Sequence, residues 1–546
     1  MTQGNGARAS GSSAWLFALM LLILIAARLP SIAQPAGGDQ FLYSYVAGRV
    51  LDGGVPYRDA FEQKPPGIFG VYALMWGFWP NESVVAAADV LAAVLVAWLL
   101  WGLGRGMFDG AVGPAAAMLF LLLGDPGIQK LGGMNVRAQC ETFIALAVAA
   151  AIAVAWSAGG RAGRLILAGA LCGVAVWLKY NAIVYALPIA LAAGLADPAA
   201  PINSRLRSLY WMAAGGAAVL GVGLLYFASA GALGDLWAGS VAYNLAYSGE
   251  TYRGVGHAFQ YVTTMPIYRA RVDGLWFLGG LGVLGLALAG RPLSRARVVA
   301  LAWVVACVLS IAINGSRGLP QYFVQAQPAL ALAAAGGLAL IWRGRHAGTR
   351  GRVVVAAAAL AVVAGTWRVG SEPTQLSRPR LFGIPQSLEN LAFDASYVSG
   401  RLARTEYLAR FERDGAGKFS PAAVERLAAF VDQHTPEATP TYVFGFASGG
   451  VYVKSRRPSA SRFFWSRPVV LEFERTRPGY GSAGLLADLE RERPAVVALQ
   501  KHDWGLAEDM KDSLDFFMTT PHLRRWLDAG YVPDYEDALF SVWRRR

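Results

Sequence analysis

Long apolar runs separated by short polar gaps fill residues 14–369, whereas residues 370–546 mix apolar and polar positions as soluble domains do. A straight crossing of a bilayer needs ~20 apolar residues in a helix. The runs therefore predict a polytopic α-helical membrane part with about eleven transmembrane helices. The runs on either side of Lys179 are short for a crossing and are expected to be broken helices. We expect the spans at residues 14–27 (uncleaved), 84–103, 110–124, 139–157, 164–178, 182–196, 208–230, 273–290, 297–314, 321–341 and 352–369.

The pattern changes after residue 370. Helices are expected at residues 387–411 and 421–433, and strands at residues 441–446, 495–499 and 539–543. Helices alternating with strands are typical of an α/β domain. The sequence thus predicts a membrane domain at residues 1–369, with an outer loop at 33–83, and a C-terminal soluble α/β domain at 370–546.

The outer loop holds the densest polar chemistry of the membrane part. Apolar residues at positions 41, 42, 45, 46 and 50 share one face of a short helix. A helix of this kind beside a membrane is expected to lie in the interface plane. Gly53 and Gly54 end it, and a polar cluster then precedes two prolines: Tyr57, Arg58, Asp59, Glu62, Lys64, Pro65 and Pro66.

Charge and composition restrict the function classes. The chain has 546 residues, of which 55% are hydrophobic and 16% charged, which is too apolar for a soluble protein of this size. Its net charge of +13 does not indicate nucleic acid, because the arginines fall in alternate gaps between the runs, as the positive-inside rule requires. With the N-terminal tail in the cytoplasm and an odd number of spans, the C-terminal domain is expected outside. All three cysteines lie in apolar runs, so a disulfide framework or thiolate metal site is not expected.

Three segments carry a resemblance to a known family. They are Asp39-Gln40 in the outer loop, Tyr57-Arg58-Asp59 with Glu62-Gln63-Lys64-Pro65-Pro66 shortly after, and Gln321-Tyr322 at the start of a late span. They resemble the GT-C superfamily of membrane glycosyltransferases, in particular the bacterial protein-mannosyltransferase and aminoarabinose-transferase group (glycosyltransferase family 39-like). That group usually shows an acidic pair at the first segment, Tyr-Asp and Lys-Pro-Pro at the second, and often His-Tyr at the third. The likeness runs across roughly residues 20–340.

The resemblance implies transfer of a sugar, with inversion, from a polyprenyl-phosphate-linked donor to a lipid, glycan or protein acceptor of the cell envelope. It also implies a multi-pass protein of a bacterial-type inner membrane, in contact with membrane lipid. An acceptor hydroxyl needs a base, and Asp39 is the candidate. The leaving lipid phosphate needs fixed cations, for which the candidates are Lys64, Arg58, Arg137, Lys179, Arg253, Arg269 and Arg317. Further residues are expected to position substrate: Gln40, Tyr57, Asp59, Glu62, Glu141, Tyr243, Asn244 and Tyr322.

Each candidate has a structural alternative. Asp39 precedes a helix and could serve only as its N-cap. Glu62 and Lys64 could form a surface ion pair. Glu141 could pair with Arg137 at i, i+4 across a helix end.

Lys179 could cap a broken helix instead of binding phosphate. A metal stays an open question. Some relatives bind a divalent cation, here Mg²⁺ or Mn²⁺, through acids and a histidine of the outer loops, but this chain offers Asn244 where a histidine is expected, and His257 only further on.

Two other classes of function compete with a transferase. A transporter or flippase should place ionisable residues near the bilayer midplane and show repeated halves. The polar residues here gather on one side, which favours the enzyme. A non-catalytic cell-envelope scaffold is kept open by Gln40, where the second acid of the family is missing.

Overall fold

The computed structural model describes residues 6–127, 133–195, 201–249, 251–290, 292–346, 348–367, 381–413, 419–504 and 511–546. The chain forms two compact units. Unit 1 comprises Met1–Gln34, Ala86–Gly223 and Ser248–Ala395, and unit 2 comprises Pro35–Val85, Leu224–Tyr247 and Ser396–Arg546. The domain boundary expected between residues 369 and 370 lies outside the described residues.

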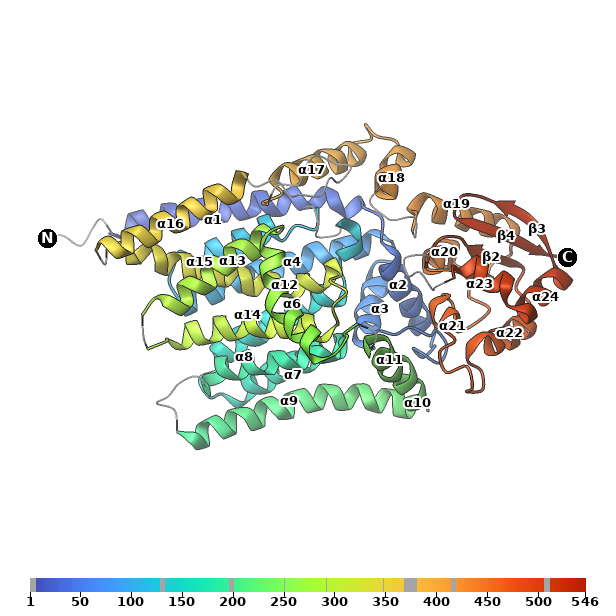
Figure 1. Ribbon diagram of the computed structural model, residues 1–546, viewed down its shortest axis with the longest axis horizontal. Coiled ribbons are helices and arrows are strands. Elements are labelled where there is room, and N and C mark those ends of the chain that lie inside the picture. Colours follow the sequence, from blue (N-terminus) through green and yellow to red (C-terminus); the bar gives the residue numbers. More distant parts are fainter. Residues whose placement is uncertain are drawn as a thin grey trace. The chain divides into compact units, whose positions relative to one another are not determined.

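Unit 1 is helical, and a helical segment lies on each of the predicted apolar runs (Figure 1). Close helix packing occurs where glycines replace side chains: a Cβ added at Gly282 would overlap the backbone of Ala333 on the neighbouring helix. The helical elements that lie wholly or mainly in this unit are α1 (Gly6–Arg28), η1 (Leu29–Ala33), α4 (Ser83–Met107), α5 (Val112–Leu123), η2 (Gly133–Val136), α6 (Cys140–Trp156), α7 (Ala162–Leu178), η3 (Tyr180–Tyr185), α8 (Ala186–Ala190), η4 (Leu191–Leu195), α9 (Ile202–Ser229), α12 (Val255–Ala270), α13 (Gly274–Leu288), α14 (Arg295–Ile313), η6 (Pro320–Ala326), α15 (Gln327–Gly344), α16 (Thr349–Trp367) and α17 (Ile384–Val398).

Several of these helices can cross a membrane. Among the described residues, five are long and apolar enough to do so: Trp15–Ala33, Ser83–Met107, Ile202–Ser229, Arg295–Ile313 and Pro320–Gly344. A sixth span is obtained if α12 and α13, which meet at 112°, count as one. The other apolar helices are shorter, including the pair that the sequence predicted on either side of Lys179.

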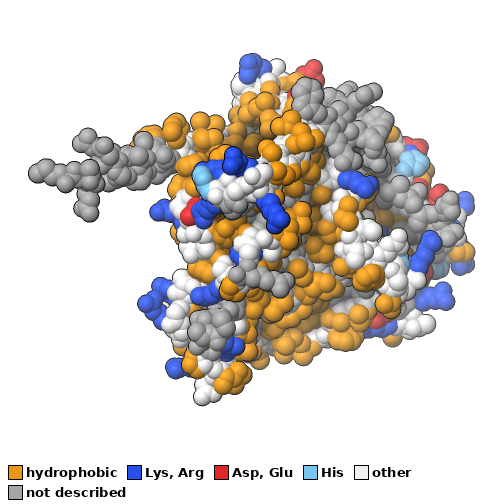
Figure 2. All heavy atoms as spheres, turned by 60° about the vertical axis from the view of Figure 1, so that its left-hand side comes forward, with side chains coloured by type: hydrophobic (Ala, Val, Ile, Leu, Met, Phe, Trp, Pro, Cys, Tyr) orange, Lys and Arg blue, Asp and Glu red, His pale blue; other side chains and the backbone are white. Residues whose placement is uncertain are grey.

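Arginines at the helix ends of unit 1 lie near other polar gaps of the same unit. The Arg295 guanidinium lies 4.3 Å from the centre of the Trp156 ring and donates to the carbonyl of Ala192, so the gaps after α6 and η4 and before α14 come together. Arg343 at the end of α15 pairs with Asp109 in the gap after α4. Figure 2 shows Lys and Arg side chains in separate spots among the hydrophobic side chains that cover much of one face.

Unit 2 contains a four-stranded sheet of order β1-β2-β4-β3. β1 and β2 pair in parallel, and the other neighbours are antiparallel. The strands are β1 (Tyr442–Phe444), β2 (Val496–Gln500), β3 (Tyr531–Glu536) and β4 (Phe540–Arg545). The helical elements are α2 (Gly38–Leu51), α3 (Gly67–Phe78), α10 (Leu233–Leu236), η5 (Trp237–Ala242), α11 (Tyr243–Gly249), α18 (Arg404–Arg413), α19 (Pro421–His434), α20 (Ser448–Ser455), α21 (Arg467–Val470), α22 (Gly481–Glu492), α23 (Ser513–Thr519) and α24 (Pro521–Gly530).

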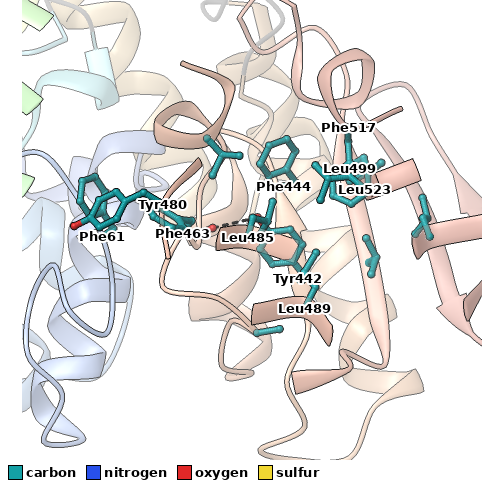
Figure 3. Close-up of a cluster of buried hydrophobic side chains, with 14 of the residues drawn as sticks. Phe61, Tyr442, Phe444, Phe463, Tyr480, Leu485, Leu489, Leu499, Phe517 and Leu523 are labelled. Carbon is teal, nitrogen blue, oxygen red and sulfur yellow. Dashed lines mark hydrogen bonds between the residues drawn. The ribbon is translucent and has the colours of Figure 1, made fainter. Parts of the chain in front are cut away.

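The outer loop belongs to the core of unit 2. Phe61 is fully buried and lies beside Tyr480 and Phe463 (Figure 3), with ring centres 5.9 and 5.4 Å away. Its backbone N–H donates to Arg462 O at 2.8 Å, and its carbonyl accepts from Trp465 Nε1 at 2.9 Å. The loop and the C-terminal part of the chain therefore share one hydrophobic core.

The expectation that α2 has one apolar face is wrong, whereas its place in the interface plane stays a prediction. The helix contacts both α3 and α20 and is buried on almost its whole circumference. Ser44, on the expected polar side, is bonded inside the protein: its hydroxyl donates to Gln40 O at 2.8 Å and accepts from Trp76 Nε1 at 2.9 Å.

Candidate functional site

Asp39 lies at the start of α2 but does not cap it. The N-cap is Gly37, and no side chain bonds the free N–H groups there, so the N-cap alternative is wrong. The Asp39 side chain is partly exposed, and no hydrogen bond or ion pair joins it to the described residues. The N-terminal end of a helix dipole stabilises a nearby anion. The structure thus offers an accessible, unengaged carboxylate.

The segment that carries Lys64 is held by two hydrogen bonds. The Tyr57 hydroxyl donates to Lys64 O at 2.6 Å, and Glu62 Oε2 accepts from Lys64 N at 2.6 Å. Tyr57 itself has a φ of +69°, a left-handed conformation that bulky residues rarely adopt. Its buried ring packs against Phe69 and Phe227, which hold it in that conformation. The side chains of Tyr57 and Glu62 therefore fix the position of the Lys64 backbone.

Glu62 is a buried carboxyl with two charged neighbours. Burial raises its pKa from 4.5 to about 7, against the opposing effect of Lys64, and Asp39 raises it further. Asp39 and Lys64 thus each lie within electrostatic reach of Glu62. The expected surface ion pair between Glu62 and Lys64 is wrong in one respect, because Glu62 is buried and its hydrogen bond goes to the lysine backbone.

Arg58 and Asp59 form an adjacent pair. Arg58 approaches the Asp59 carboxylate at 2.9 Å and also donates to Ala230 O at 3.1 Å. Asp59 accepts from Val55 N at 2.7 Å, which closes the turn. Partial burial acts to raise the Asp59 pKa, but the hydrogen bonds from Arg58 and Val55 outweigh it and lower the pKa. Both residues stabilise the turn. The Arg58 guanidinium is already paired with the Asp59 carboxylate.

Tyr243 and Asn244 support the same loop. Asn244 Nδ2 donates to Gln63 O and, at 2.9 Å, to Ser240 O. The buried Tyr243 ring lies 6.1 Å from that of Phe61. Both residues therefore connect α11 to the outer loop.

In unit 1, Glu141 and Lys179 form a buried ion pair. Lys179 Nζ lies 2.5 Å from Glu141 Oε1 and 4.3 Å above the Tyr322 ring. The sequence singled out all three residues but did not pair them. The alternative in which Glu141 pairs with Arg137 is wrong, because Arg137 NH1 lies 3.8 Å from Asp89.

Asp89 is a buried residue that the sequence analysis missed. It accepts from Ala138 N at 2.9 Å as well as facing Arg137. A single acid inside the apolar run 84–103 was the signal that could have found it. Arg137 is therefore placed beside a carboxylate of its own unit.

A buried hydrogen-bond network in unit 1 continues from Tyr322. Gln325 Nε2 donates to Tyr322 O at 2.8 Å, and Gln325 Oε1 accepts from Tyr185 at 2.9 Å and from Ser310 at 2.6 Å. Asn181 Nδ2 donates to Ser310 Oγ at 2.9 Å. Apart from Tyr322, the sequence analysis named none of these as site residues, since isolated polar residues within apolar runs carry little local signal.

The remaining arginines of unit 1 differ in environment. Arg269 is buried, 3.2 Å from Asp273 and 4.3 Å from the Phe323 ring centre. Arg253 is exposed just before α12, and Arg317 is half-buried after α14. The segments of these last two meet, because the hydroxyl of Tyr252 donates to Ala312 O at 2.6 Å.

The described residues do not fit a divalent cation. No three of their His, Cys, Asp and Glu side chains gather as a ligand set. Asn244 is bonded to backbone carbonyls, and His257 Nδ1 accepts from Arg253 N at 3.3 Å.

Comparison with known proteins places the fold. No protein-family model and no curated protein sequence match the chain. The structure is similar to ArnT from Cupriavidus metallidurans bound to undecaprenyl phosphate, with a TM-score of 0.56 and 16% identity over 97% of this chain and 98% of that one. For ArnT in the apo state the TM-score is 0.55 with 15% identity, over 98% of both chains. The oligosaccharyltransferase of Archaeoglobus fulgidus with Zn and sulfate gives 0.48 and 13%, over 88% and 67%. The chain therefore shares the fold of the two ArnT structures, in agreement with the fold that the resemblance predicted.

Proposed function

We propose that the protein is an inverting glycosyltransferase. It moves a hexosyl or pentosyl group from a polyprenyl-phosphate donor to a hydroxyl of a lipid, glycan or protein acceptor at the extracytoplasmic face of the membrane. The observation that carries the proposal is the partly exposed Asp39 carboxylate, which is unengaged among the described residues and within electrostatic reach of Glu62, the residue that bonds the Lys64 backbone. The ArnT-like fold supports it, since one of those ArnT structures holds undecaprenyl phosphate.

The reaction is a single displacement. Asp39 accepts the proton of the acceptor hydroxyl while the hydroxyl oxygen attacks the anomeric carbon of the donor. The bond from that carbon to the carrier phosphate breaks with its electron pair, so the phosphate leaves as an anion. Attack from the face opposite the leaving group inverts the anomeric centre. Lys64 balances the developing phosphate charge, and Glu62 and Tyr57 position Lys64 through its backbone.

Among the predicted phosphate ligands of unit 1, Arg253 is exposed and carries no ion pair within the described residues, so it stays a candidate. Arg137 and Arg269 are buried beside the carboxylates of Asp89 and Asp273, so their charge is already balanced. We assign Lys179 and Glu141 to a structural ion pair. Arg317 stays a further candidate for phosphate binding. Substitution of Arg253 should therefore weaken donor binding more than substitution of Arg269.

For the topology we keep about eleven spans, with the N-terminus in the cytoplasm and the C-terminal domain outside. The association of arginine-bearing helix ends in unit 1 supports this arrangement, because the positive-inside rule puts such ends on one side. It would place the protein in a bacterial-type inner membrane.

The transporter alternative has one observation in its favour, the buried ionisable residues of unit 1. The positions of these residues in their helices argue against a transport role, however. Glu141 is in the first turn of α6, Lys179 follows the end of α7, and Arg269 and Asp273 lie where α12 meets α13. Transport sites are expected near the middle of the membrane between repeated halves, and the sequence shows no internal repeat. Charged pairs at helix ends are better explained as structural.

The test is transfer of labelled sugar by purified protein in lipid from a panel of polyprenyl-phosphate donors. Loss of a general base should lower turnover of Asp39→Asn by ~10²–10⁴-fold while donor binding persists. Asp52→Asn, at the exposed C-terminal end of the same helix, is the matched control and should retain activity. Equal turnover of wild type and Asp39→Asn would refute the role of Asp39, and lack of product from every donor would refute the transferase.

A further inference from the structure

A groove of about 730 Å³ lies in unit 2, well away in sequence from Asp39. It is formed by α22, α24, the start of β3 and the end of β4, and α24 contacts both α22 and β3 (Figure 1). Its chemistry is not used in the transfer reaction. The side chains that give it character are Glu490, Arg493, Arg525, Trp526, Tyr531 and Arg545.

The groove is positively charged without internal compensation. Arg493, Arg525 and Arg545 line it against a single carboxylate, Glu490, and none of the four forms an ion pair within the described residues. Two of the guanidinium groups are fixed by backbone carbonyls: Arg545 NH1 donates to Arg493 O at 2.8 Å, and Arg525 Nε donates to Pro521 O at 3.2 Å. Their remaining N–H groups can bind phosphate or carboxylate oxygens, often two at once.

Aromatic rings lie beside these cations. The centres of the Trp526 and Tyr531 rings are 4.8 Å apart, and the Tyr531 hydroxyl donates to Pro494 O at 2.8 Å, which fixes that ring. Burial raises the pKa of Tyr531 to about 12 against the effect of Arg545, so the phenol stays neutral. An indole ring with an apolar face and a polar edge suits a sugar ring, which also has an apolar face and hydroxyl edges. Glu490 can accept hydrogen bonds from such hydroxyls.

We propose that this groove binds an anionic saccharide, with the sugar ring on Trp526 and its phosphate or carboxylate group on Arg493 and Arg525. The inference goes beyond sugar transfer, because the groove is built from residues of unit 2 that take no part in the proposed reaction. Binding to the groove can therefore be measured without a polyprenyl-phosphate donor. Phosphate and carboxylate present the same chemistry to a guanidinium, and the ligands in the test separate the contribution of the ring from that of the anion.

The experiment is ligand-observed saturation-transfer NMR on the full-length protein in detergent. The ligands are glucose 6-phosphate, glucuronate and glucose, with inorganic phosphate as a competitor. Hydrogen bonds to a charged group are stronger than those between neutral groups, so the two anionic sugars should bind roughly tenfold or more tightly than glucose. Displacement of the anionic sugars by inorganic phosphate should need a higher competitor concentration than displacement by a sugar phosphate.

Matched variants locate the site. Arg525→Gln should weaken binding of both anionic sugars by roughly tenfold, whereas Arg524→Gln, at the preceding position of α24 but outside the groove, should not. Arg493→Gly is a second variant that protects the fold, because Arg493 has a φ of +45° that glycine adopts freely. It should also weaken binding.

Three results would overturn the proposal. The first is equal binding of glucose and glucose 6-phosphate, and the second is full displacement by inorganic phosphate at equal concentration, which would leave no role for the ring. The third is equal binding by Arg524→Gln, Arg525→Gln and Arg493→Gly.

Discussion

Glu62→Gln tests whether the buried carboxyl beside Lys64 governs the pH dependence of stability. Burial raises the pKa of Glu62 in the folded protein from 4.5 to about 7. The folded chain therefore holds this proton at pH values where the unfolded chain has released it. Since stability falls with pH wherever the folded state binds more protons, the contribution of Glu62 is full below pH 4.5 and is lost as pH rises to about 7.

The size of the effect follows from the same rise in pKa. At 1.36 kcal/mol per pKa unit, the free energy of unfolding should decrease by about 3 kcal/mol across that interval. Glutamine resembles the protonated carboxyl in shape and can still accept the hydrogen bond from Lys64 N. The variant should therefore lose this pH dependence and be more stable than wild type at pH 8, by up to roughly 6–12 °C at 2–4 °C per kcal/mol.

The assay is thermal unfolding of detergent-solubilised protein, followed by tryptophan fluorescence at pH 5, 6, 7 and 8. Asp52→Asn, an exposed acid of α2 whose partner Arg49 lies 3.5 Å away, is the control for general effects of charge removal. We expect the control to follow wild type. If Glu62→Gln has the same slope as wild type, or is less stable at pH 8, then burial of an ionised carboxylate is not the cause of the pH dependence.

Two further predictions concern packing and the ion pair of unit 1. Lys179→Met leaves a buried charge on Glu141 and should cost ~3–5 kcal/mol, whereas combining it with Glu141→Gln should recover most of that loss. Additive losses in thermal unfolding would show that the residues do not interact. Gly239→Ala should destabilise unit 2 by roughly 1–3 kcal/mol, because the new Cβ would overlap the Tyr57 ring. Gly48→Ala, with open space at its Cβ in helix α2, should be neutral or stabilising, and equal losses in the two variants would contradict the packing argument.

Helices in the membrane part could be predicted because their signal is local. Each apolar run contains a helical segment, and even the break after Lys179 appears where two short runs meet. Elements with mixed signals were missed. The helix expected over residues 387–411 is two helices, α17 and α18, separated after Val398. Strand β3 was not expected, since Pro533 and Asp534 within it disfavour strands; its Pro533 lies on an edge strand with a local register shift.

The site was predicted as a set of residues rather than as a set of partners. Motif spacing picked out Tyr57, Glu62 and Lys64, but their joint support of the lysine backbone depends on a left-handed turn that no propensity indicates. Glu141 and Lys179 are 38 positions apart, so only the packing of α6 on α7 could pair them. The burial of α2 on both sides was missed for a similar reason: α20, which packs against it, is distant in sequence, and a single helix cannot show such a contact.

The burial of Gln40 bears on whether the missing second acid argues against activity. Asp39 is partly exposed, whereas the next side chain, Gln40, is fully buried in α2. A carboxylate there would be desolvated and would lie next to Asp39, and Glu62 already shows how burial raises the pKa of such a group. An amide at this position avoids the burial of a second charge and leaves the accessible acid unchanged. The Gln40 departure is therefore compatible with the role that we propose for Asp39, since the partly exposed carboxylate is the one the chain has kept.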